Sequence, residues 1–155
     1  KLIIPGVGSY PEGSNSILPL KDELHKFAEK NMILGICLGM QLFCQKGFEF
    51  SVHDGLSLIN GECIKLNTNK PLPHIGWNNV EVIRDSKLLK GLEDQKFYFM
   101  HSYEVVNYTD CNALTTYEGH KFVASIENKN VFGVQFHPEK SGEAGLELFN
   151  NFLKL

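Results

Sequence analysis

Residues 32–41 read Met-Ile-Leu-Gly-Ile-Cys-Leu-Gly-Met-Gln, an apolar run that passes through a Gly-x-Cys-x-Gly motif at residues 35–39. The first five residues carry no charge, which is typical of a parallel strand covered on both faces. Glycines on both sides of Cys37 then predict a sharp turn into a helix that begins near Leu38. A buried strand that turns directly into a helix predicts an α/β fold with a largely parallel sheet.

Cys37 stands at the tip of this turn, which is the position of the nucleophile in strand–turn–helix elbows. We expect the turn to hold Cys37 in a strained conformation, and the glycines to let backbone and substrate approach closely. A sulfur at a helix N-terminus lies at the positive end of the helix dipole, which lowers the thiol pKa and favours the thiolate. A Cys buried between two packing glycines would give the same motif, so a nucleophile requires a base nearby.

Such a base is available at His137-Pro138-Glu139, directly after the apolar segment 131–136. In extended backbone, residues i and i+2 share a face, so the Glu139 carboxylate is expected to hold one ring N–H of His137. The other ring nitrogen would then face the sulfur of Cys37. A solvated strand end would explain the second motif alone, but the two motifs together predict a Cys37–His137–Glu139 triad.

Two further helices follow from apolar spacing, and short strands fill the middle of the chain. Residues 18–30 predict a helix with one apolar face formed by Leu20, Leu24, Phe27 and Ala28. Residues 142–153 predict a second helix with an apolar face formed by Leu146, Phe149, Phe152 and Leu153. Strands are predicted at residues 2–4, 62–66, 80–83, 97–99, 105–106, 122–126 and 131–134. Because no repeat or linker interrupts this pattern, residues 1–155 are expected to form one domain.

Composition and charge narrow the class of protein. The chain is 43% hydrophobic with a net charge of −3, so it has no electrostatic footprint for nucleic acid or an anionic membrane. Its histidines are not at ligand spacing with cysteines or carboxylates, so neither a metal nor a cofactor is expected. No Cys-x-x-Cys is present, and Cys44, Cys63 and Cys111 are interpreted as small core residues of a reduced, cytoplasmic protein.

Five blocks of sequence carry a family resemblance. Three of them resemble class I (triad-type) glutamine amidotransferases: residues 5–8 (PGVG), 35–41 (GICLGMQ) and 133–142 (GVQFHPEKSG). Two more, residues 73–78 (PHIGWN) and 98–103 (YFMHSY), are similar to the glutaminase subunits of imidazole glycerol phosphate synthases. That resemblance implies hydrolysis of L-glutamine by a heterodimer whose second subunit, a (β/α)8 cyclase of histidine biosynthesis, accepts the ammonia.

The resemblance also implies roles for individual residues. Cys37 would form a γ-glutamyl thioester, and His137 would shuttle the protons. The elbow places the Leu38 N–H in the oxyanion hole, and the family implies that the loop around Val7 and Gly8 supplies the other donor. The substrate-binding residues that it implies are Gly8, Leu38, Gln41, Glu49, His101, Ser102 and Tyr103. The ammonia exit and partner interface would include Trp77, Asn78 and Tyr98.

The sequence differs from the family in one respect, and it leaves three alternative functions open. Family members begin with a β-α-β portion of roughly 45 residues before the PGVG loop, and we expect that portion to be missing from this sequence. Paralogues with the same triad supply ammonia for the amidination of bacterial surface sugars. A stand-alone Cys hydrolase on a related sheet and a non-catalytic regulatory subunit are the alternatives from other classes.

Overall fold

Strand β2 (Ile33–Ile36) lies between two parallel neighbours in the computed structural model, which describes residues 1–155. Those neighbours are β1 (Leu2–Ile4) and β12 (Val131–Val134), in register with β2 so that Ile4 and Val134 flank its carboxyl end. The carboxyl ends of these parallel strands therefore meet at one edge of the sheet, directly before Cys37. The strands predicted at residues 2–4 and 131–134, and the α/β class, are confirmed.

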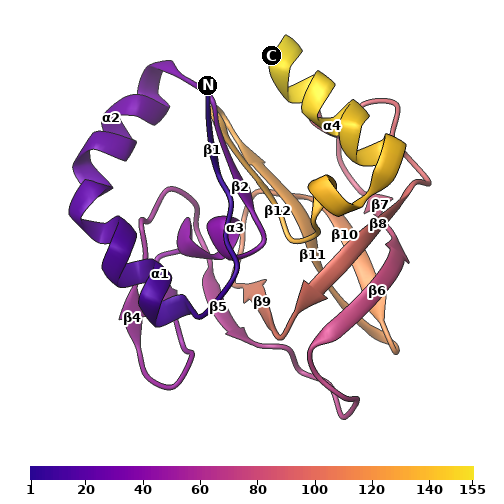
Figure 1. Ribbon diagram of the computed structural model, residues 1–155, viewed down its shortest axis with the longest axis horizontal. Helices are drawn as coiled ribbons and strands as arrows, with labels where there is room; N and C mark the ends of the chain where they lie inside the picture. Colours follow the sequence, from indigo (N-terminus) through magenta and orange to yellow (C-terminus); the bar gives the residue numbers. More distant parts are fainter.

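The same sheet continues with antiparallel strands, giving the order β1-β2-β12-β11-β10-β7 (Figure 1). Its added strands are β11 (His120–Asn128), β10 (Cys111–Tyr117) and β7 (Glu81–Val82). Only Glu118 and Gly119 separate β10 from β11, and both have positive φ, as in the tight turns of hairpins. A connection this short can join only antiparallel neighbours. The parallel strands of this sheet are therefore β1, β2 and β12, next to Cys37.

Helices cover both faces of the parallel strands (Figure 1). They are α1 (Tyr10–Ile17), a 3₁₀ turn η1 (Leu18–Leu20), α2 (Lys21–Lys30), α3 (Leu38–Leu42) and α4 (Gly142–Lys154). Successive residues of β2 pack into different halves of the core, as the alternation of a strand requires. Ile33 clusters with Leu24 of α2, whereas Leu34 clusters with Leu148 of α4.

The helix predicted at residues 18–30 is wrong at its N-terminal end. Pro19 lies in the 3₁₀ turn η1 that separates α2 from α1, and Leu20 is 53% exposed rather than part of a buried face. Helix α1 was missed because Gly13 and the Ser-Asn-Ser segment after it have low helix propensity. Its support is tertiary instead, since Ser14 Oγ donates to the Asp54 carbonyl at 2.7 Å.

The C-terminal helix was predicted at the right place, and Phe149 and Phe152 of its predicted face pack against the core, but the other two residues do not. Leu146 and Leu153 are each 66% exposed, while Gly145, Leu148 and Phe152 are buried. The reason is a close approach at Gly145, where any side chain would overlap the carbonyl of Pro138. That contact sets the rotation of α4 about its axis, and apolar spacing alone does not contain it.

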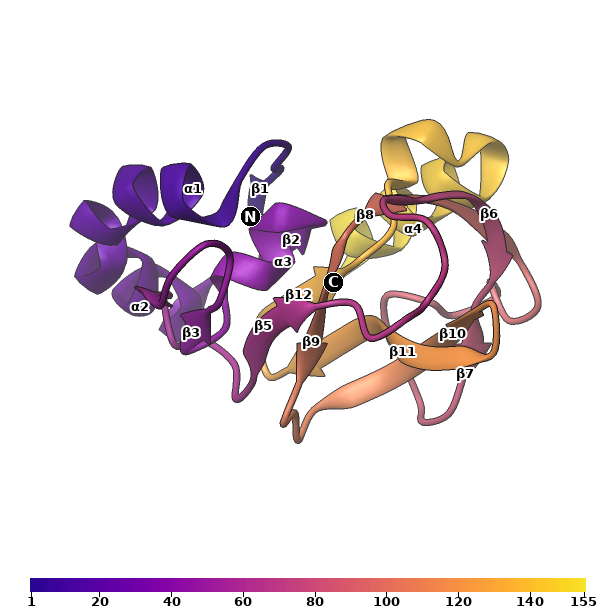
Figure 2. The same cartoon turned by 90° about the horizontal axis from the view of Figure 1, so that it is seen from below.

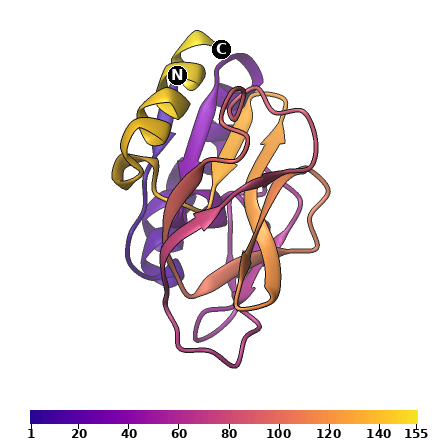
Figure 3. The ribbon, with the colours of Figure 1, turned by 90° about the vertical axis from the view of Figure 1, so that its right-hand side faces the viewer.

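Two smaller sheets complete the fold (Figure 2). One has the order β4-β3-β5-β9 and consists of His53–Asp54, Lys46–Gly47, Glu62–Lys65 and Tyr103–Val106. The other pairs β6 (His74–Asn79) with β8 (Lys96–His101). Strands β6 and β10 were not predicted, because glycine, asparagine and alanine within them have low strand propensity and their pairing is set by long-range partners. The two chain ends lie at the same end of the molecule, where Lys1 Nζ donates to the Leu153 carbonyl (Figure 3).

Gly39 in α3 is the residue at which the elbow packs most closely against the sheet. A Cβ at this position would overlap the carbonyl oxygen of Ile4 at the end of β1. Because that neighbour is backbone, Gly39→Ala should lower the free energy of unfolding by about 3 kcal/mol, as expected for overpacking a rigid site. Gly91→Ala is the control, since its side chain would meet open space and only its φ of +76° costs stability, about 1 kcal/mol. Urea unfolding of both variants measures the difference, and equal losses would contradict the prediction.

Candidate active site

Cys37 occupies the turn between β2 and α3, with φ 52° and ψ −110°. This backbone conformation is unfavourable for any residue with a side chain, which confirms the predicted strain. The turn is held from both sides, because the Cys37 N–H donates to the Val134 carbonyl at 2.8 Å and its carbonyl accepts from the Gln41 N–H at 3.1 Å. The elbow therefore fixes the backbone of Cys37 at the carboxyl edge of the parallel strands.

The protonation state of the sulfur differs from the sequence-based expectation. Burial raises the pKa of the Cys37 thiol to about 12, while hydrogen bonds from the Leu38 backbone and the Gln135 side chain act in the opposite direction. Helix α3 has only five residues and Cys37 is 7% exposed, so the cost of desolvating a thiolate exceeds the benefit of the helix terminus. The expectation of a lowered pKa is wrong for this state, in which the sulfur is a thiol.

His137 and Glu139 form the predicted contact, though not through extended backbone. His137 Nδ1 lies 2.6 Å from Glu139 Oε1, across the 3₁₀ turn η2 (Pro138–Lys140). A carboxylate can only accept, so Nδ1 carries the proton and Nε2 has the free lone pair of a base. Nε2 is buried and has no hydrogen-bond partner within the chain. An unpartnered basic nitrogen beside a nucleophile is suited to receiving a proton.

The His137 segment is fastened to strand β8. The His137 N–H donates to the Tyr98 carbonyl at 2.8 Å, and its own carbonyl accepts from Ser141 Oγ at 2.6 Å. The same hydroxyl oxygen accepts from the Tyr98 N–H at 3.0 Å. Three bonds among these residues therefore fix the imidazole relative to β8, whose next residues line the pocket beside Cys37.

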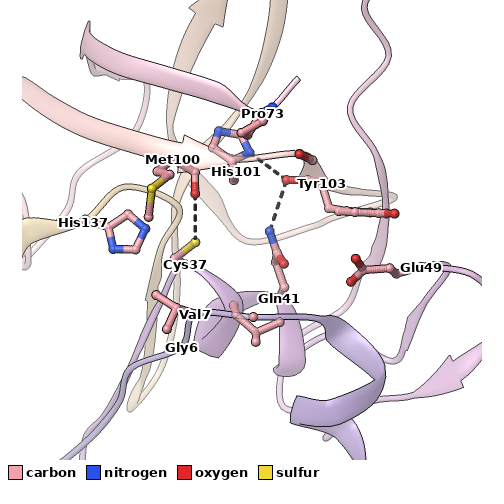
Figure 4. A pocket seen from close by; sticks show the side chains of 13 residues that line it. Gly6, Val7, Cys37, Gln41, Glu49, Pro73, Met100, His101, Tyr103 and His137 are labelled. Atoms are coloured by element: carbon pink, nitrogen blue, oxygen red, sulfur yellow. Dashed lines mark hydrogen bonds between the residues drawn. The ribbon is translucent and has the colours of Figure 1, made fainter. Parts of the chain in front are cut away.

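No hydrogen bond joins Cys37 to His137. The thiol donates instead to the Met100 carbonyl at 3.8 Å, and the imidazole lies to the side of that contact (Figure 4). Both side chains nevertheless line one pocket of about 200 Å³. Proton transfer from the sulfur to His137 therefore requires the thiol to leave the Met100 carbonyl.

The loop of residues 5–8 borders this pocket opposite Met100. Gly6 must be a glycine, because a Cβ there would lie 2.7 Å from the Leu38 Cβ and 2.8 Å from the Gly39 nitrogen. Gly8 has φ +112°, and the Val7 side chain between the two glycines is 74% exposed. The predicted oxyanion residues, Leu38, Val7 and Gly8, thus lie together at the pocket.

The predicted substrate-binding residues also gather at the pocket, which is lined by Gln41, Glu49, His101, Ser102 and Tyr103. Glu49 Oε2 accepts the Tyr10 N–H at 2.6 Å and the carboxylate faces the cavity (Figure 4). His101 is buried, and burial lowers its pKa to about 3, so the ring is neutral. The Glu49 carboxylate at the cavity suits an ammonium group, whereas both ring nitrogens of His101 are already paired, with the Tyr103 carbonyl and with His74.

The residues predicted for the ammonia exit lie away from this pocket. Trp77 and Tyr98 are paired across β6 and β8, with ring centroids 6.0 Å apart, and Trp77 is 51% exposed. Asn78 Nδ2 donates to the Thr116 carbonyl at 2.7 Å. Tyr98 alone reaches the catalytic segment, through the backbone bonds to His137 and Ser141.

Two active-site residues were missed from the sequence. Met100 contributes its carbonyl, which no side-chain pattern reveals. Gln135 is fully buried, and its Nε2 lies 3.6 Å from Cys37 Sγ. Its position two residues before His137 was the available signal, because alternate residues at the end of a strand lie on one face.

The remaining cysteines and histidines do not form a second site. Cys44, Cys63 and Cys111 are free and buried, in agreement with their interpretation as core residues. No group of three or more His, Cys, Asp or Glu side chains is arranged to hold a metal ion. None of the helices has both the length and the apolar character needed to cross a membrane.

Comparison with solved structures places the fold. A structure described as a glutamine amidotransferase superposes with a TM-score of 0.72 at 16% identity, covering 98% of this chain and 76% of that one. PurLQS from Thermotoga maritima gives the same TM-score at 19% identity, with 98% and 78% of the two chains covered. At these identities the similarity concerns the fold alone.

Comparison of sequences is more specific. The family model for glutamine amidotransferase class-I matches residues 2–155. The imidazole glycerol phosphate synthase subunit HisH 1 of Campylobacter jejuni is 42% identical over all of this chain and 81% of its own length. The HisH subunit of Methanocaldococcus jannaschii is 41% identical over all of this chain and 80% of its own length. The chain therefore belongs to the class I glutamine amidotransferase family, and within it to the group of HisH subunits.

Proposed function

We propose that this chain is the glutaminase subunit of an imidazole glycerol phosphate synthase, converting L-glutamine to glutamate and passing ammonia to a (β/α)8 cyclase subunit. The observation that carries the proposal is one pocket lined by the elbow cysteine and by a buried His137, whose Nδ1 is held by Glu139. Relatives named as HisH subunits are 41–42% identical over the whole chain, which supports the same reaction.

The reaction begins when His137 Nε2 takes the proton of Cys37 and the sulfur attacks the carboxamide carbon of glutamine. A C–S bond forms and the carbonyl becomes a tetrahedral oxyanion. The Leu38 N–H, at the start of α3, is one donor for that oxyanion, and the backbone around Val7 and Gly8 supplies the second. The exposed Val7 side chain lets this peptide reorient at low cost.

The intermediate then collapses to a γ-glutamyl thioester. The C–N bond breaks, and the imidazolium of His137 gives its proton to the departing ammonia. Neutral His137 next removes a proton from water, which attacks the thioester carbon. The resulting tetrahedral intermediate collapses with cleavage of the C–S bond, the His137 imidazolium returns its proton to the sulfur, and glutamate leaves. Glu139 holds Nδ1 throughout, which maintains the tautomer and stabilises each imidazolium.

Substrate recognition follows from the charges at the pocket. Glu49 is the carboxylate counter-charge for the α-ammonium of glutamine. Gln41 and the backbone of Gly8, His101, Ser102 and Tyr103 provide the polar groups for the rest of the amino acid. Trp77, Asn78 and Tyr98 form the surface through which ammonia passes to the cyclase, and the two-subunit enzyme works in the cytoplasm.

The resting geometry predicts activation by the partner. Cys37 is a thiol bonded to Met100 rather than to His137, so the isolated chain should hydrolyse glutamine slowly. Adding the cyclase with its ligand should raise glutamate formation by between about 5-fold and 150-fold, the usual range of coupling between sites. A coupled glutamate assay on the chain with and without the cyclase measures this ratio. Full activity without any partner would refute the subunit assignment and favour a stand-alone hydrolase.

A further inference from the structure

A continuous hydrogen-bond network connects the nucleophile to strand β9. Gln135 Nε2 lies 3.6 Å from Cys37 Sγ, and Gln135 Oε1 lies 3.0 Å from Gln41 Nε2. Gln41 Nε2 also lies 3.1 Å from the Tyr103 carbonyl oxygen (Figure 4). These contacts join three segments that are far apart in the sequence, and the proposed reaction gives no role to Gln135.

The Tyr103 carbonyl fixes the orientation of both amides. A carbonyl oxygen can only accept, so the atom of Gln41 that faces it must be the NH₂ group. The second hydrogen of that NH₂ group points to Gln135, whose facing atom must then be oxygen. The NH₂ group of Gln135 is therefore the end directed at the sulfur. The positions of oxygen and nitrogen in the Gln135 amide are therefore fixed by its hydrogen-bond partners.

The same carbonyl is held from its other side by His101. His101 Nδ1 lies 2.8 Å from the Tyr103 oxygen and must be protonated, so its Nε2 accepts from His74 Nδ1 at 3.2 Å. Burial lowers the pKa of both rings, to about 3 for His101 and about 4 for His74. Both imidazoles are therefore neutral, with His74 donating to His101 and His101 donating to the Tyr103 carbonyl. The Tyr103 carbonyl, which sets the amide orientation, is thereby held in place.

Two contacts at the sulfur oppose each other. The Met100 carbonyl accepts the S–H and repels a thiolate, so it favours the protonated form. The Gln135 NH₂ group donates, so it interacts more strongly with a thiolate than with a thiol. Because Gln135 is fully buried, water cannot replace its donor if the amide is removed.

We propose that Gln135 is a positioning residue that stabilises the Cys37 thiolate during proton transfer, with its NH₂ group oriented by Gln41 and the Tyr103 carbonyl. The inference deepens the proposed glutaminase function and rests on it. In this role the amide shifts the equilibrium of the Cys37 proton towards His137, an effect that packing of the Gln135 side chain alone would not produce.

The test is the rate of Cys37 alkylation by iodoacetamide at about pH 8, where the rate is proportional to the small fraction of thiolate. The carboxamide of this reagent resembles the end of the glutamine side chain. Gln135→Met keeps the length of the side chain but removes the donor, and Gln135→Glu keeps its shape but has no N–H. The matched control is Gln95→Met, which changes an exposed glutamine far from the pocket. Mass spectrometry of the peptide containing Cys37 gives the extent of labelling.

We expect both Gln135 variants to lower this labelling rate about tenfold, because losing a hydrogen bond to a charged group raises the pKa of Cys37 by about one unit. With the cyclase present, kcat should fall about tenfold, since one pKa unit is a factor of ten in thiolate, while KM changes less than about threefold. Gln135→Met leaves the ionisable groups around Cys37 unchanged, so its effect reports the lost donor by itself; these groups are His137, Glu139, Lys140, His101, Tyr103, Glu49 and Cys63. Gln135→Glu adds a carboxylate beside the sulfur, which disfavours the thiolate further.

The alternative is a merely structural role for the buried amide. In that case Gln135→Met would lower the thermal unfolding midpoint but leave the labelling rate at the value of the wild type and Gln95→Met, which would overturn the inference. An unchanged labelling rate in a stable Gln135→Glu variant would overturn it equally. Failure of the proposed function has a different signature, because wild-type chain with the cyclase would then form no glutamate from glutamine.

Discussion

Cys37→Ala should abolish glutamine hydrolysis, with a rate loss of about 10⁴-fold or more, because no other group in the pocket can form the thioester. Synthesis by the cyclase from added ammonium salt should continue, since that reaction does not need the sulfur. The fold should persist, because alanine keeps the Cβ and the bonds of the elbow are made by backbone atoms. Glutamate formation and ammonia-dependent synthesis, measured on the same complex, separate the two activities.

Cys44→Ala is the matched control for this experiment. Cys44 is buried, as Cys37 is, but it lies in the core and does not line the pocket. We expect it to lose stability without losing glutaminase activity per folded molecule. If Cys37→Ala removed both glutamine-dependent and ammonia-dependent synthesis, the assignment of a separate ammonia-producing role would fall.

His137→Ala should have the second-largest effect, a fall in kcat of about 10²-fold to 10⁴-fold, because it removes the only base whose free nitrogen is buried at the site. Glu139→Gln should cost less, about 10-fold to 100-fold, the equivalent of one hydrogen bond to a charged group. The side chain of Glu139 is 46% exposed, so water can replace part of the lost interaction. Steady-state kinetics with the cyclase present gives both values.

The order of these two effects tests the assigned roles. Glu143→Gln, an exposed carboxylate in the first turn of α4, is the control for a change of charge near the site. A larger loss in Glu139→Gln than in His137→Ala would mean that the carboxylate does more than orient the imidazole. Equal losses of kcat in Glu139→Gln and Glu143→Gln would show that Glu139 has no specific role beside His137.

The fold could be predicted from the sequence wherever local pattern dominates. The strands at residues 33–36 and 131–134 are continuous apolar runs, and the elbow follows from glycines two residues either side of Cys37. Helix α1 and strands β6 and β10 could not be predicted, because their own residues favour other conformations. Burial of Tyr10 and pairing with distant strands stabilise these elements instead.

The sequence by itself determined the chemistry: a cysteine on an elbow, a histidine with a carboxylate two residues later, and a family whose members hydrolyse glutamine. Each of these features is formed by residues within a few positions of one another, so it can be recognised in the sequence. Only the tertiary structure decided the state of the sulfur, which is buried, protonated and directed at Met100 rather than at His137. It alone brought Gln135 to Cys37, because contacts between residues 98 positions apart and the cost of burying charge depend on the whole fold.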